Sequence, residues 1–468
     1  MSSSEPHRVD PERLALTPEC IVRSGLCIGC GCCAARSMGG TMRYDRLGQI
    51  KPLAAGYVPG FGELCSFSPH ASNEDDIASS LFQAPRFINP LIGRFEAAFV
   101  GHVREGRFRA HGSSGGMASW AAAELLKRGM VDGVAHVVPR LTPGVPLFEY
   151  AVSRSALEVC SGAKSRYYPV ELSRIIREIR QRPGRYAVTG IPCFIKALHL
   201  LAKQDPLIKE RLTFTLGLFC GHMKSARFAE SLVWQMGEQM EGVAALDFRL
   251  KDTARPANWY AAHLRLRNGG VKRLDWWHLA DGDWGAGFFQ NSACNFCDDV
   301  VAETADISFG DAWVEPYSSD GNGTSVVIVR NPQIEELVRA AIAEGRLELR
   351  EVDAEFVIRT QAAGFRQRRE GLAFRLSWPR RGVIPKKRVM PKRGGLETRR
   401  MVIYWLRSSI SEGSHRVFWL ARSLNAPRIY LCWASSMLAL YQGVAYSRGW
   451  LGAIVDRLFP PKGGEGGA

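Results

Sequence analysis

Three cysteines with an even spacing lie near the start of the chain, in the segment CIGCGCC. Cys27, Cys30 and Cys33 form a C-x2-C-x2-C run, with Gly29 and Gly31 between them. Thiolates at this spacing, on one short loop loosened by glycines, can bind three iron atoms of a single 4Fe–4S cluster. A zinc site or free thiols are the alternatives, and the spacing with its glycines favours the iron–sulfur cluster.

The fourth ligand of this cluster does not follow from the spacing. In a bacterial ferredoxin loop a cysteine would follow four residues after Cys33, but Ser37 occupies that position. We expect Cys65 to be the fourth ligand and keep Cys20 as the second choice. Cys32, inside the run, is expected to point away from the same cluster and not to bind it.

A second group of cysteines is less regular. Cys294 and Cys297 form a single C-x2-C pair, which suits zinc, a redox disulfide or an iron–sulfur cluster. Cys193 directly follows a predicted strand and Cys220 ends another, so the carboxyl edge of a sheet could bring both to the pair. Burial of Cys193 and Cys220 in the core is the alternative, and the residues alone leave this choice open.

A glycine-rich turn, SSGG, precedes a predicted helix rich in alanine and leucine. Ser113, Ser114, Gly115 and Gly116 would place free backbone N–H groups at the positive end of the helix dipole, where an anion such as a pyrophosphate binds. A Ser-Ser-Gly-Gly sequence is also an ordinary helix start. The G-x-G-x-x-G fingerprint after a strand is absent, so the sequence does not support a Rossmann NAD site.

The secondary structure around these residues must position them. From about residue 95 the hydrophobic pattern of the sequence alternates between that of strands and that of helices. The predicted strands are Phe95–Val100, Gly133–Val138, Tyr186–Thr189, Phe214–Phe219, Ile307–Phe309 and Ser325–Val329. The predicted helices are Met117–Arg128, Val170–Arg180, Phe194–Lys203, Ser225–Met240 and Ile334–Glu344. The alternation predicts an α/β domain with a mixed, partly parallel sheet flanked by helices, and the Trp-rich stretch 255–290 is expected to add strands and loops.

Composition places the chain among ordinary globular proteins, with 46% hydrophobic and 23% charged residues. The net charge of +15 could favour nucleic acid, an anionic membrane surface or an acidic redox partner. The N-terminus lacks the apolar core of a secretory signal, so we expect a cytoplasmic protein. In that reducing compartment, clustered thiols indicate metal or redox chemistry more often than disulfides.

The sequence suggests four parts. Residues 1–19 are expected to be a flexible lead, 20–90 a small ferredoxin-like iron–sulfur segment, 91–380 the α/β catalytic domain, and 381–468 a basic linker and helical extension with a disordered tail. Nine basic residues against one acidic residue lie between Arg380 and Arg400, and no charged residue occurs from Ile429 to Ser447. Packing of the extension on the core or on a partner is favoured over contact with the inner-membrane surface and over a membrane span. Nucleic-acid binding ranks lowest, because no recognised module is present.

Five motifs in order resemble the beta-subunit family of coenzyme F420 hydrogenases and dehydrogenases, which includes ferredoxin-dependent reductases of the chlorophyll pathway. They are CIGCGCC, SSGGMAS, GIPCFIKAL, GLFCGH and CNFCDDVVAETADISFGD. The resemblance runs from about Cys27 to about residue 350. It implies a flavoprotein that binds FAD and two 4Fe–4S clusters.

The resemblance also assigns residues. It makes the second cluster's ligands Cys193, Cys220, Cys294 and Cys297, and it turns Ser114, Gly115 and Gly116 towards the flavin phosphates. Lys196 and His222 adjoin cluster cysteines and are candidates for contact with flavin or substrate, with a supporting role as the alternative. Phe194 stands where the family usually has Gln, which removes any polar contact from that position.

The expected function is that of an oxidoreductase. A one-electron donor such as ferredoxin would exchange electrons with the clusters and FAD, and FAD with a two-electron acceptor. That acceptor is expected to be coenzyme F420 or another small molecule, with a polysaccharide pathway as one suggestion from the resemblance. An electron-transfer subunit without its own substrate, and a zinc-stabilised binding protein, are the two rival hypotheses.

Overall fold

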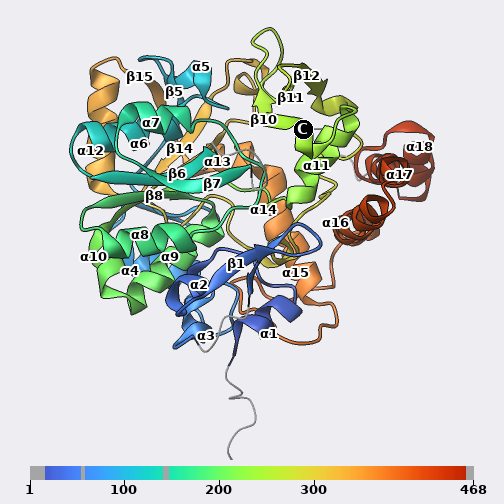
Figure 1. The fold of residues 1–468 in the computed structure, drawn as a ribbon, viewed down its shortest axis with the longest axis horizontal. Helices are drawn as coiled ribbons and strands as arrows, with labels where there is room; N and C mark the ends of the chain where they lie inside the picture. The colour runs from blue at the N-terminus through green and yellow to red at the C-terminus, as the bar shows by residue number, and fades with distance from the viewer. Residues whose placement is uncertain (1–15, 54–57, 141–146, 460–468) are drawn as a thin grey trace, which may run out of the picture.

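The structure of the protein is a computed structural model, which describes residues 16–53, 58–140 and 147–459. A mixed eight-stranded sheet forms its centre, in the order β15-β5-β14-β13-β9-β8-β6-β7 (Figure 1). Its strands are β5 (Ala97–Val103), β6 (Gly133–Pro139), β7 (Phe148–Ser153), β8 (Tyr186–Gly190), β9 (Leu212–Leu218), β13 (Ile307–Asp311), β14 (Ser325–Val329) and β15 (Leu347–Val352). All six predicted strands belong to this sheet, which confirms the α/β fold class.

The directions of the strands bring three candidate segments to one edge. β6, β8, β9 and β13 run parallel to one another, β14 is antiparallel to β13, and β5 is antiparallel to β14. β5 therefore runs in the same direction as β8 and β9, and the carboxyl ends of these three strands share an edge. The glycine-rich turn follows β5, Cys193 follows β8, and Cys220 follows β9.

Helices cover both faces of the sheet because the strands alternate apolar side chains between the two faces. In β14, Val327 and Val329 pack with α6 (Met117–Lys127) and α12 (Pro332–Ala343) on one face. Val326 and Ile328 pack on the other face, next to Val357 of α13 (Ala354–Thr360). The second face is completed by α8 (Ser173–Gln181), α9 (Pro192–Gln204), α10 (Pro206–Arg211) and α14 (Ala362–Arg368).

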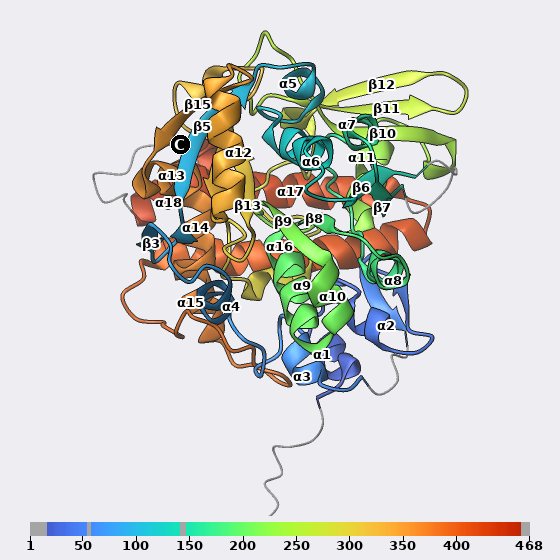
Figure 2. The same ribbon diagram turned by 90° about the vertical axis from the view of Figure 1, so that its left-hand side faces the viewer.

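The cysteine-rich N-terminal segment lies at one end of the molecule, against α8 and α9 (Figures 1 and 2). It contains α1 (Pro18–Arg23), α2 (Cys32–Arg36), the hairpin of β1 (Thr41–Tyr44) and β2 (Ile50–Leu53), and α3 (Phe61–Leu64). The connection to the sheet holds α4 (Glu74–Leu81), β3 (Phe87–Asn89) and β4 (Gly93–Phe95). Most of the predicted flexible lead, residues 1–15, lies outside the described residues.

The Trp-rich region forms a separate sheet, as expected, and carries part of a second core. Its strands are β10 (Val243–Leu250), β11 (Ala261–Leu266) and β12 (Val271–Asp275), all antiparallel. Phe248 and Leu264 of this sheet pack with Phe228 of α11 (Ala226–Gln235). The remaining helices before the extension are α5 (Phe108–His111), α7 (Ala156–Ser161) and α15 (Glu370–Leu376).

The C-terminal extension is helical, as predicted, and packs on this second core. It consists of α16 (Thr398–Ser423), α17 (Pro427–Tyr446) and α18 (Gly449–Leu458), which lie together on one side of the molecule (Figure 1). Ile410 and Phe418 of α16 are fully buried among core residues such as Phe289. Among the described helices, none is long and apolar enough to cross a membrane. Residues 460–468, predicted to be a disordered tail, lie outside the described residues.

Candidate redox site

The first cysteine group converges on one cavity of about 30 Å³. Cys27, Cys30, Cys33 and Cys65 all line it. The first two lie on the loop between α1 and α2, Cys33 is the second residue of α2, and Cys65 directly follows α3. The rest of the wall is largely apolar, including Ile28, Leu64 and Phe67, which belong to the same buried cluster.

Gly29 and Gly31 give this loop its path. Their φ angles are +80° and +88°, in the left-handed region that favours glycine. A side chain on Gly29 would lie 2.4 Å from the carbonyl oxygen of Ile50, and one on Gly31 would lie 2.3 Å from the Glu171 carboxylate. The glycines of CIGCGCC therefore let the loop pack tightly against β2 and the start of α8.

Cys65, and not Cys20, lies with the other three thiols. Cys33 and Cys65 each interact electrostatically with Cys27 and Cys30. Burial, together with the neighbouring Cys30 and Cys27, raises the pKa of the Cys65 thiol to about 12, so four thiolates need a bound cation to coexist there. Cys20 is exposed and accepts a hydrogen bond from Thr17 Oγ1 at 3.5 Å.

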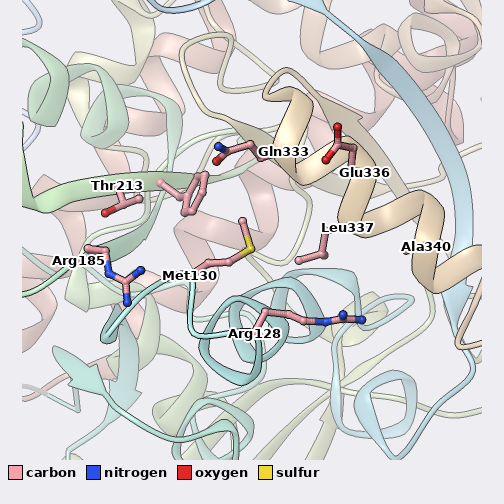
Figure 3. Close-up of a pocket in the computed structure, with 9 residues that line it drawn as sticks. Arg128, Met130, Arg185, Thr213, Gln333, Glu336, Leu337 and Ala340 are labelled. Atoms are coloured by element: carbon pink, nitrogen blue, oxygen red, sulfur yellow. The ribbon is translucent and has the colours of Figure 1, made fainter.

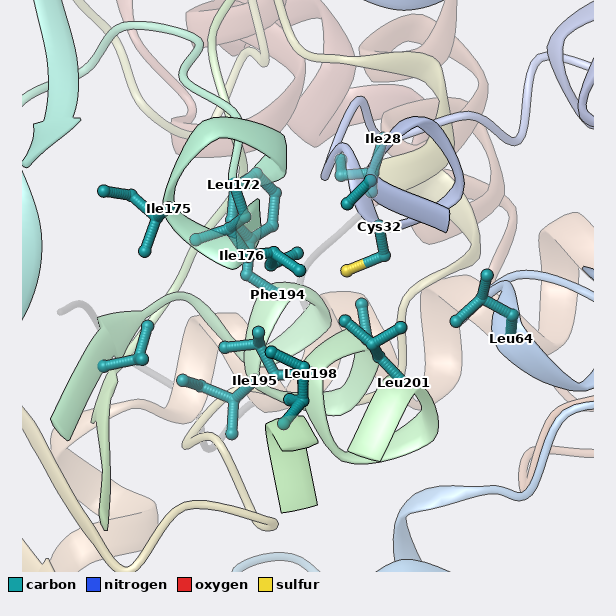
Figure 4. Close-up of a cluster of buried hydrophobic side chains, with 14 of the residues drawn as sticks. Ile28, Cys32, Leu64, Leu172, Ile175, Ile176, Phe194, Ile195, Leu198 and Leu201 are labelled. Carbon is teal, nitrogen blue, oxygen red and sulfur yellow. The ribbon is translucent and has the colours of Figure 1, made fainter. Parts of the chain in front are cut away.

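Cys32 has a different environment from its neighbours. Its side chain is 1% exposed and packs in the apolar cluster formed with α8 and α9. Figure 4 shows its sulfur among Phe194, Leu198 and Leu201. Cys32 also lines the cavity of the first group and interacts with Cys30, so the expectation that it points away from the cluster stays a prediction.

The second cysteine group is assembled from three separate segments. Cys193 is the second residue of α9, Cys220 follows β9, and Cys294 and Cys297 lie on the connection that leads to β13. Cys193 interacts electrostatically with each of the other three thiols. Burial raises the pKa of Cys220 to about 12 and that of Cys294 to about 11, and the backbone N–H of Met223 donates to Cys294 Sγ at 3.3 Å.

Each cysteine group offers a donor set of four thiols. Within the described residues, no three His, Cys, Asp or Glu side chains are close enough to ligate one metal ion. A 4Fe–4S cluster binds each thiolate through a different iron atom, so its ligands lie further apart than the ligands of a single ion. Two sets of four half-buried or buried thiols, each linked by electrostatic interactions, fit that donor set.

The two groups are neighbours. Cys30 of the first group contributes to the electrostatic environment of Cys193 in the second. Ser66, next to Cys65, donates a hydrogen bond from Oγ to the Cys193 carbonyl oxygen at 3.1 Å. Lys51 interacts with Cys27 and with Cys294, and its ammonium donates to the Cys27 carbonyl oxygen at 2.6 Å. The two groups therefore lie next to each other inside the protein.

A buried ionic network lies beside the second group and includes Lys196. Lys196 Nζ is 3.1 Å from Glu74 Oε1, and both side chains are about 5% exposed or less. Lys387 pairs with Asp298 at 3.3 Å, and Arg388 with Glu303 at 2.7 Å. Lys196 thus supports the protein around Cys193, and the segment expected to be a linker is fixed to the core through Lys387 and Arg388.

The glycine-rich turn lies where β5 meets α6. A side chain on Gly115 would come within 2.8 Å of β5 and β14 atoms, so this glycine is required for packing. Ser113 Oγ accepts from the Ser165 N–H at 2.8 Å, and Ser114 Oγ donates to the Thr324 carbonyl oxygen at 2.9 Å. Lys251 Nζ donates to the Ser114 carbonyl oxygen at 2.7 Å.

Positive charge surrounds this turn. Burial and the nearby charges of Lys164, Arg249 and Arg109 lower the pKa of Lys251 to about 7. Arg249 is itself held by Asp311, at the end of β13, with an N–O distance of 3.0 Å. Both serine hydroxyls and these cations already have protein partners, so the flavin-phosphate site stays a prediction that rests on the positive charge around the turn.

His222 connects the turn to Cys220 through aromatic rings. It is buried, its ring stacks on Trp284 with centroids 4.4 Å apart, and its Nε2 atom has no hydrogen-bond partner in the described structure. Trp284 also contacts Tyr167, at 4.7 Å, two residues from the Ser165 that binds Ser113. A chain of contacts therefore connects the serine turn with the aromatic rings next to Cys220.

Several residues of the site were not predicted from the sequence. They are Arg249, Lys251, Tyr167, Trp284 and Arg368. Arg368 lies at the end of α14 and donates to the Cys220 and Gly221 carbonyl oxygens at 2.7 and 2.8 Å. The run RQRR at 366–369 is a signal of clustered charge, but nothing in its spacing links it to Cys220.

A larger cavity, of about 590 Å³, lies at the opposite edge of the sheet (Figure 3). Met130, Arg185 and Thr213 precede or begin β6, β8 and β9, and Gln333 and Glu336 come from α12. It contains none of the predicted site residues. The candidate chemistry therefore lies at the carboxyl edge and not in this cavity.

Comparison with known proteins shows the family. Residues 98–177 match the N-terminal model, and 184–355 the C-terminal model, of the coenzyme F420 hydrogenase/dehydrogenase beta subunit. A coenzyme F420-dependent sulfite reductase of Methanocaldococcus jannaschii is 24% identical over 349 residues, 71% of this chain and 48% of that protein, so the chain spans about half of that relative.

Among solved structures, a chain of the F420-reducing NiFe hydrogenase complex from Methanosarcina barkeri is similar to this protein. It has a TM-score of 0.47 and 17% identity, covering 62% of this chain and 95% of that one. The two family models follow each other in order and together span the sheet, the glycine-rich turn and all four cysteines of the second group. The protein therefore belongs to the coenzyme F420 hydrogenase/dehydrogenase beta-subunit family.

Proposed function

We propose that the protein is an iron–sulfur flavoprotein oxidoreductase that exchanges electrons between a one-electron donor such as ferredoxin and a two-electron acceptor. Its family is one of redox proteins, and the convergence of eight cysteines into two neighbouring groups is the observation that carries the proposal. When bound, two 4Fe–4S clusters would supply one-electron transfer, and FAD would link it to two-electron chemistry.

The residues have distinct roles in this proposal. Cys27, Cys30, Cys33 and Cys65 would hold one cluster, and Cys193, Cys220, Cys294 and Cys297 the other. The Ser113–Gly116 turn, with the cations around it, would bind the flavin phosphates. His222 and Trp284 would help to exclude water from the region next to Cys220, because their rings stack on each other there and His222 is buried.

The acceptor is proposed to be coenzyme F420 or a comparable small molecule, in keeping with the family. An electron-transfer subunit of a larger assembly is the second candidate. The observation that favours it is the family, whose two models describe a beta subunit. Steady turnover of a small acceptor by the isolated chain would exclude this second candidate.

Anaerobic purification followed by metal and flavin analysis tests the proposal. We expect about eight iron atoms, with matching sulfide, per chain, and one bound flavin. Colourless protein with stoichiometric zinc and no iron would contradict it and support the zinc-stabilised alternative. Iron without flavin would refute the flavin assignment and leave the clusters in place.

A further inference from the structure

Three buried arginines lie together behind the second cysteine group. Arg368 ends α14, Arg375 lies in α15, and Arg407 lies in α16, and their exposed fractions are 2%, 3% and 8%. Burial, together with the charges of Arg407 and Arg368, lowers the pKa of Arg375 to about 9. In the part of the chain that the structure describes, no carboxylate forms an ion pair with any of the three.

Two of these arginines are satisfied by neutral partners. Arg375 donates to the carbonyl oxygens of Asn295 and Gln367, at 2.9 and 3.0 Å. Arg407 donates to the carbonyl oxygen of Gly285 and to Gln290 Oε1, the latter at 3.2 Å. The side-chain oxygen of Gln367 accepts from both arginines. The N–H groups of Arg375 and Arg407 therefore already have acceptors within the protein.

Arg368 differs from the other two. Only its Nη2 atom has partners, the carbonyl oxygens of Cys220 and Gly221, while its Nε and Nη1 atoms are buried without any acceptor among the described residues. Its guanidinium also interacts electrostatically with the thiols of Cys297, Cys220 and Cys294. A guanidinium with two unused donors thus adjoins three of the four thiols.

Such a group needs an anionic acceptor, because buried donors and buried cations are stable only when they are paired. We propose that Arg368 is the counter-ion of the second 4Fe–4S cluster. Its Nε–H and Nη1–H groups would donate to the cluster's sulfur atoms, and its fixed charge would raise the cluster's reduction potential. This inference rests on the proposed function, and it makes Arg368 a positioning and tuning residue.

The direction of the effect follows from charge. Reduction transfers one electron from a one-electron donor, such as ferredoxin, to the cluster, and no bond is made or broken. The reduced cluster carries one more negative charge than the oxidised cluster, so a fixed cation beside it stabilises the reduced form more. Hydrogen bonds to the sulfur atoms act in the same direction. Removing Arg368 should therefore lower the potential.

The test is a redox titration of the full anaerobic chain, followed by electron paramagnetic resonance. Arg368→Gln removes the charge but keeps an amide donor, and Arg368→Lys keeps the charge but loses the fork of N–H groups. In a Cys65→Ala background, which should lack the first cluster, the remaining signal belongs to the second. We expect Arg368→Gln to keep its iron and to shift the reduction equilibrium about tenfold against reduction, or ~59 mV for one electron.

Matched variants make the result specific. Arg368→Lys should have a potential between those of the wild type and Arg368→Gln. Arg375→Met, which removes an equally buried arginine with full partners, should shift the potential less than Arg368→Gln. If Arg368→Gln loses the cluster, the test depends on Arg368→Lys. A reduction potential of Arg368→Lys equal to or above that of the wild type would overturn the inference.

The inference and the proposed function fail in different ways. An Arg368→Gln protein with full iron and an unchanged potential would overturn the counter-ion role and leave the clusters in place. Wild-type protein without a second cluster signal, or without iron, would refute the proposed function itself. Iron content is therefore measured on every sample before its potential is titrated.

Discussion

The two cysteine groups are built in opposite ways. Three thiols of the first group come from seven consecutive residues, and apolar side chains dominate its surroundings. Lys51 is the cation that acts on a thiol of this group, Cys27. The second group is drawn from three distant segments, and Arg368 and Lys387 both act on its thiols. A group of cysteines that are neighbours in the sequence has few charged side chains around it. A group assembled from distant segments is surrounded by the charged side chains of each of those segments.

This difference has an expected consequence for electron transfer. A cluster with fewer nearby cations should have the lower reduction potential, because less positive charge offsets the added negative charge of its reduced form. Electrons would then pass downhill from the first group, which lies at one end of the molecule, to the second, which adjoins the His222–Trp284 wall. The predictions below test whether the two groups are separate and whether their surroundings differ.

The largest effect is expected from removing the fourth thiol of the first group. Cys65→Ala should lose about half of the iron, because a 4Fe–4S cluster is not held stably by three cysteines. Cys20→Ala is the matched control and should keep all of the iron, since Cys20 is exposed and accepts a hydrogen bond from Thr17. The measurement is the iron content of both variants after anaerobic purification. Loss of all the iron from Cys65→Ala would mean that the two groups are not independent.

The next prediction compares two lysines, one next to each cysteine group. Lys387→Met should lower the free energy of unfolding by about 3 kcal/mol, because it removes one partner of a buried ion pair with Asp298. Lys51→Met loses a hydrogen bond to the Cys27 carbonyl oxygen and should cost about 1.5 kcal/mol. Anaerobic urea unfolding measures both. Equal losses would contradict the difference between the two charge environments.

A third prediction concerns α16, which contacts both regions. His415 Nδ1 lies 2.8 Å from the Ser411 carbonyl oxygen and His415 Nε2 lies 3.4 Å from Gln49 Nε2. Burial, with the positive charges of Lys51 and Lys224, lowers the pKa of His415 from 6.5 to about 4. The unfolded chain therefore binds a proton between pH 6.5 and 4 that the folded protein does not, and stability falls as the pH falls through this window.

His415→Gln should remove this dependence. Between pH 6.5 and 4 the wild type should lose up to about 3 kcal/mol more unfolding free energy than the variant. Urea unfolding at several pH values checks the difference, which also cancels the contributions of the other histidines. Parallel pH profiles for the two proteins would show that His415 is protonated in the folded state as readily as in the unfolded chain.

The smallest effect is expected far from both groups. Arg185 forms an exposed pair with Asp132 at 3.0 Å and lines the cavity of Figure 3. Exposed pairs of this kind contribute little to stability. Arg185→Met should therefore leave iron content, cluster potentials and acceptor reduction unchanged. A marked loss of acceptor reduction would move the substrate site to this opposite edge of the sheet.

The sequence predicted the central elements better than the edges. Six strands were predicted and all six lie inside the sheet, because their runs of apolar residues are buried on both faces. The two edge strands, β7 and β15, were not predicted. β15, with the sequence LELREV, is half polar because one face of an edge strand is less covered, and its pattern is weaker.

The ends of helices were also less predictable than their positions. All five predicted helices of the α/β region are present, but α11 ends at Gln235 and not at Met240. Gly237 follows it with a φ of +76°, a conformation that ends a helix readily. The segment after residue 380 resembles a linker in composition, yet Lys387 and Arg388 are buried in ion pairs whose partners lie some 85 residues or more earlier in the chain.

By itself the sequence determined the first cysteine run, the alternation of strands and helices, and the family motifs. These signals depend on neighbouring residues, so local spacing and periodicity suffice. Only the tertiary structure decided that Cys65 and not Cys20 joins the first group, and that Arg368 adjoins the second. Such contacts join segments far apart in the chain, and they arise from the packing of helices and strands around the sheet, which no local pattern encodes. For the two groups, most of the cysteines that come together could be predicted from the sequence, but the charges beside them could not.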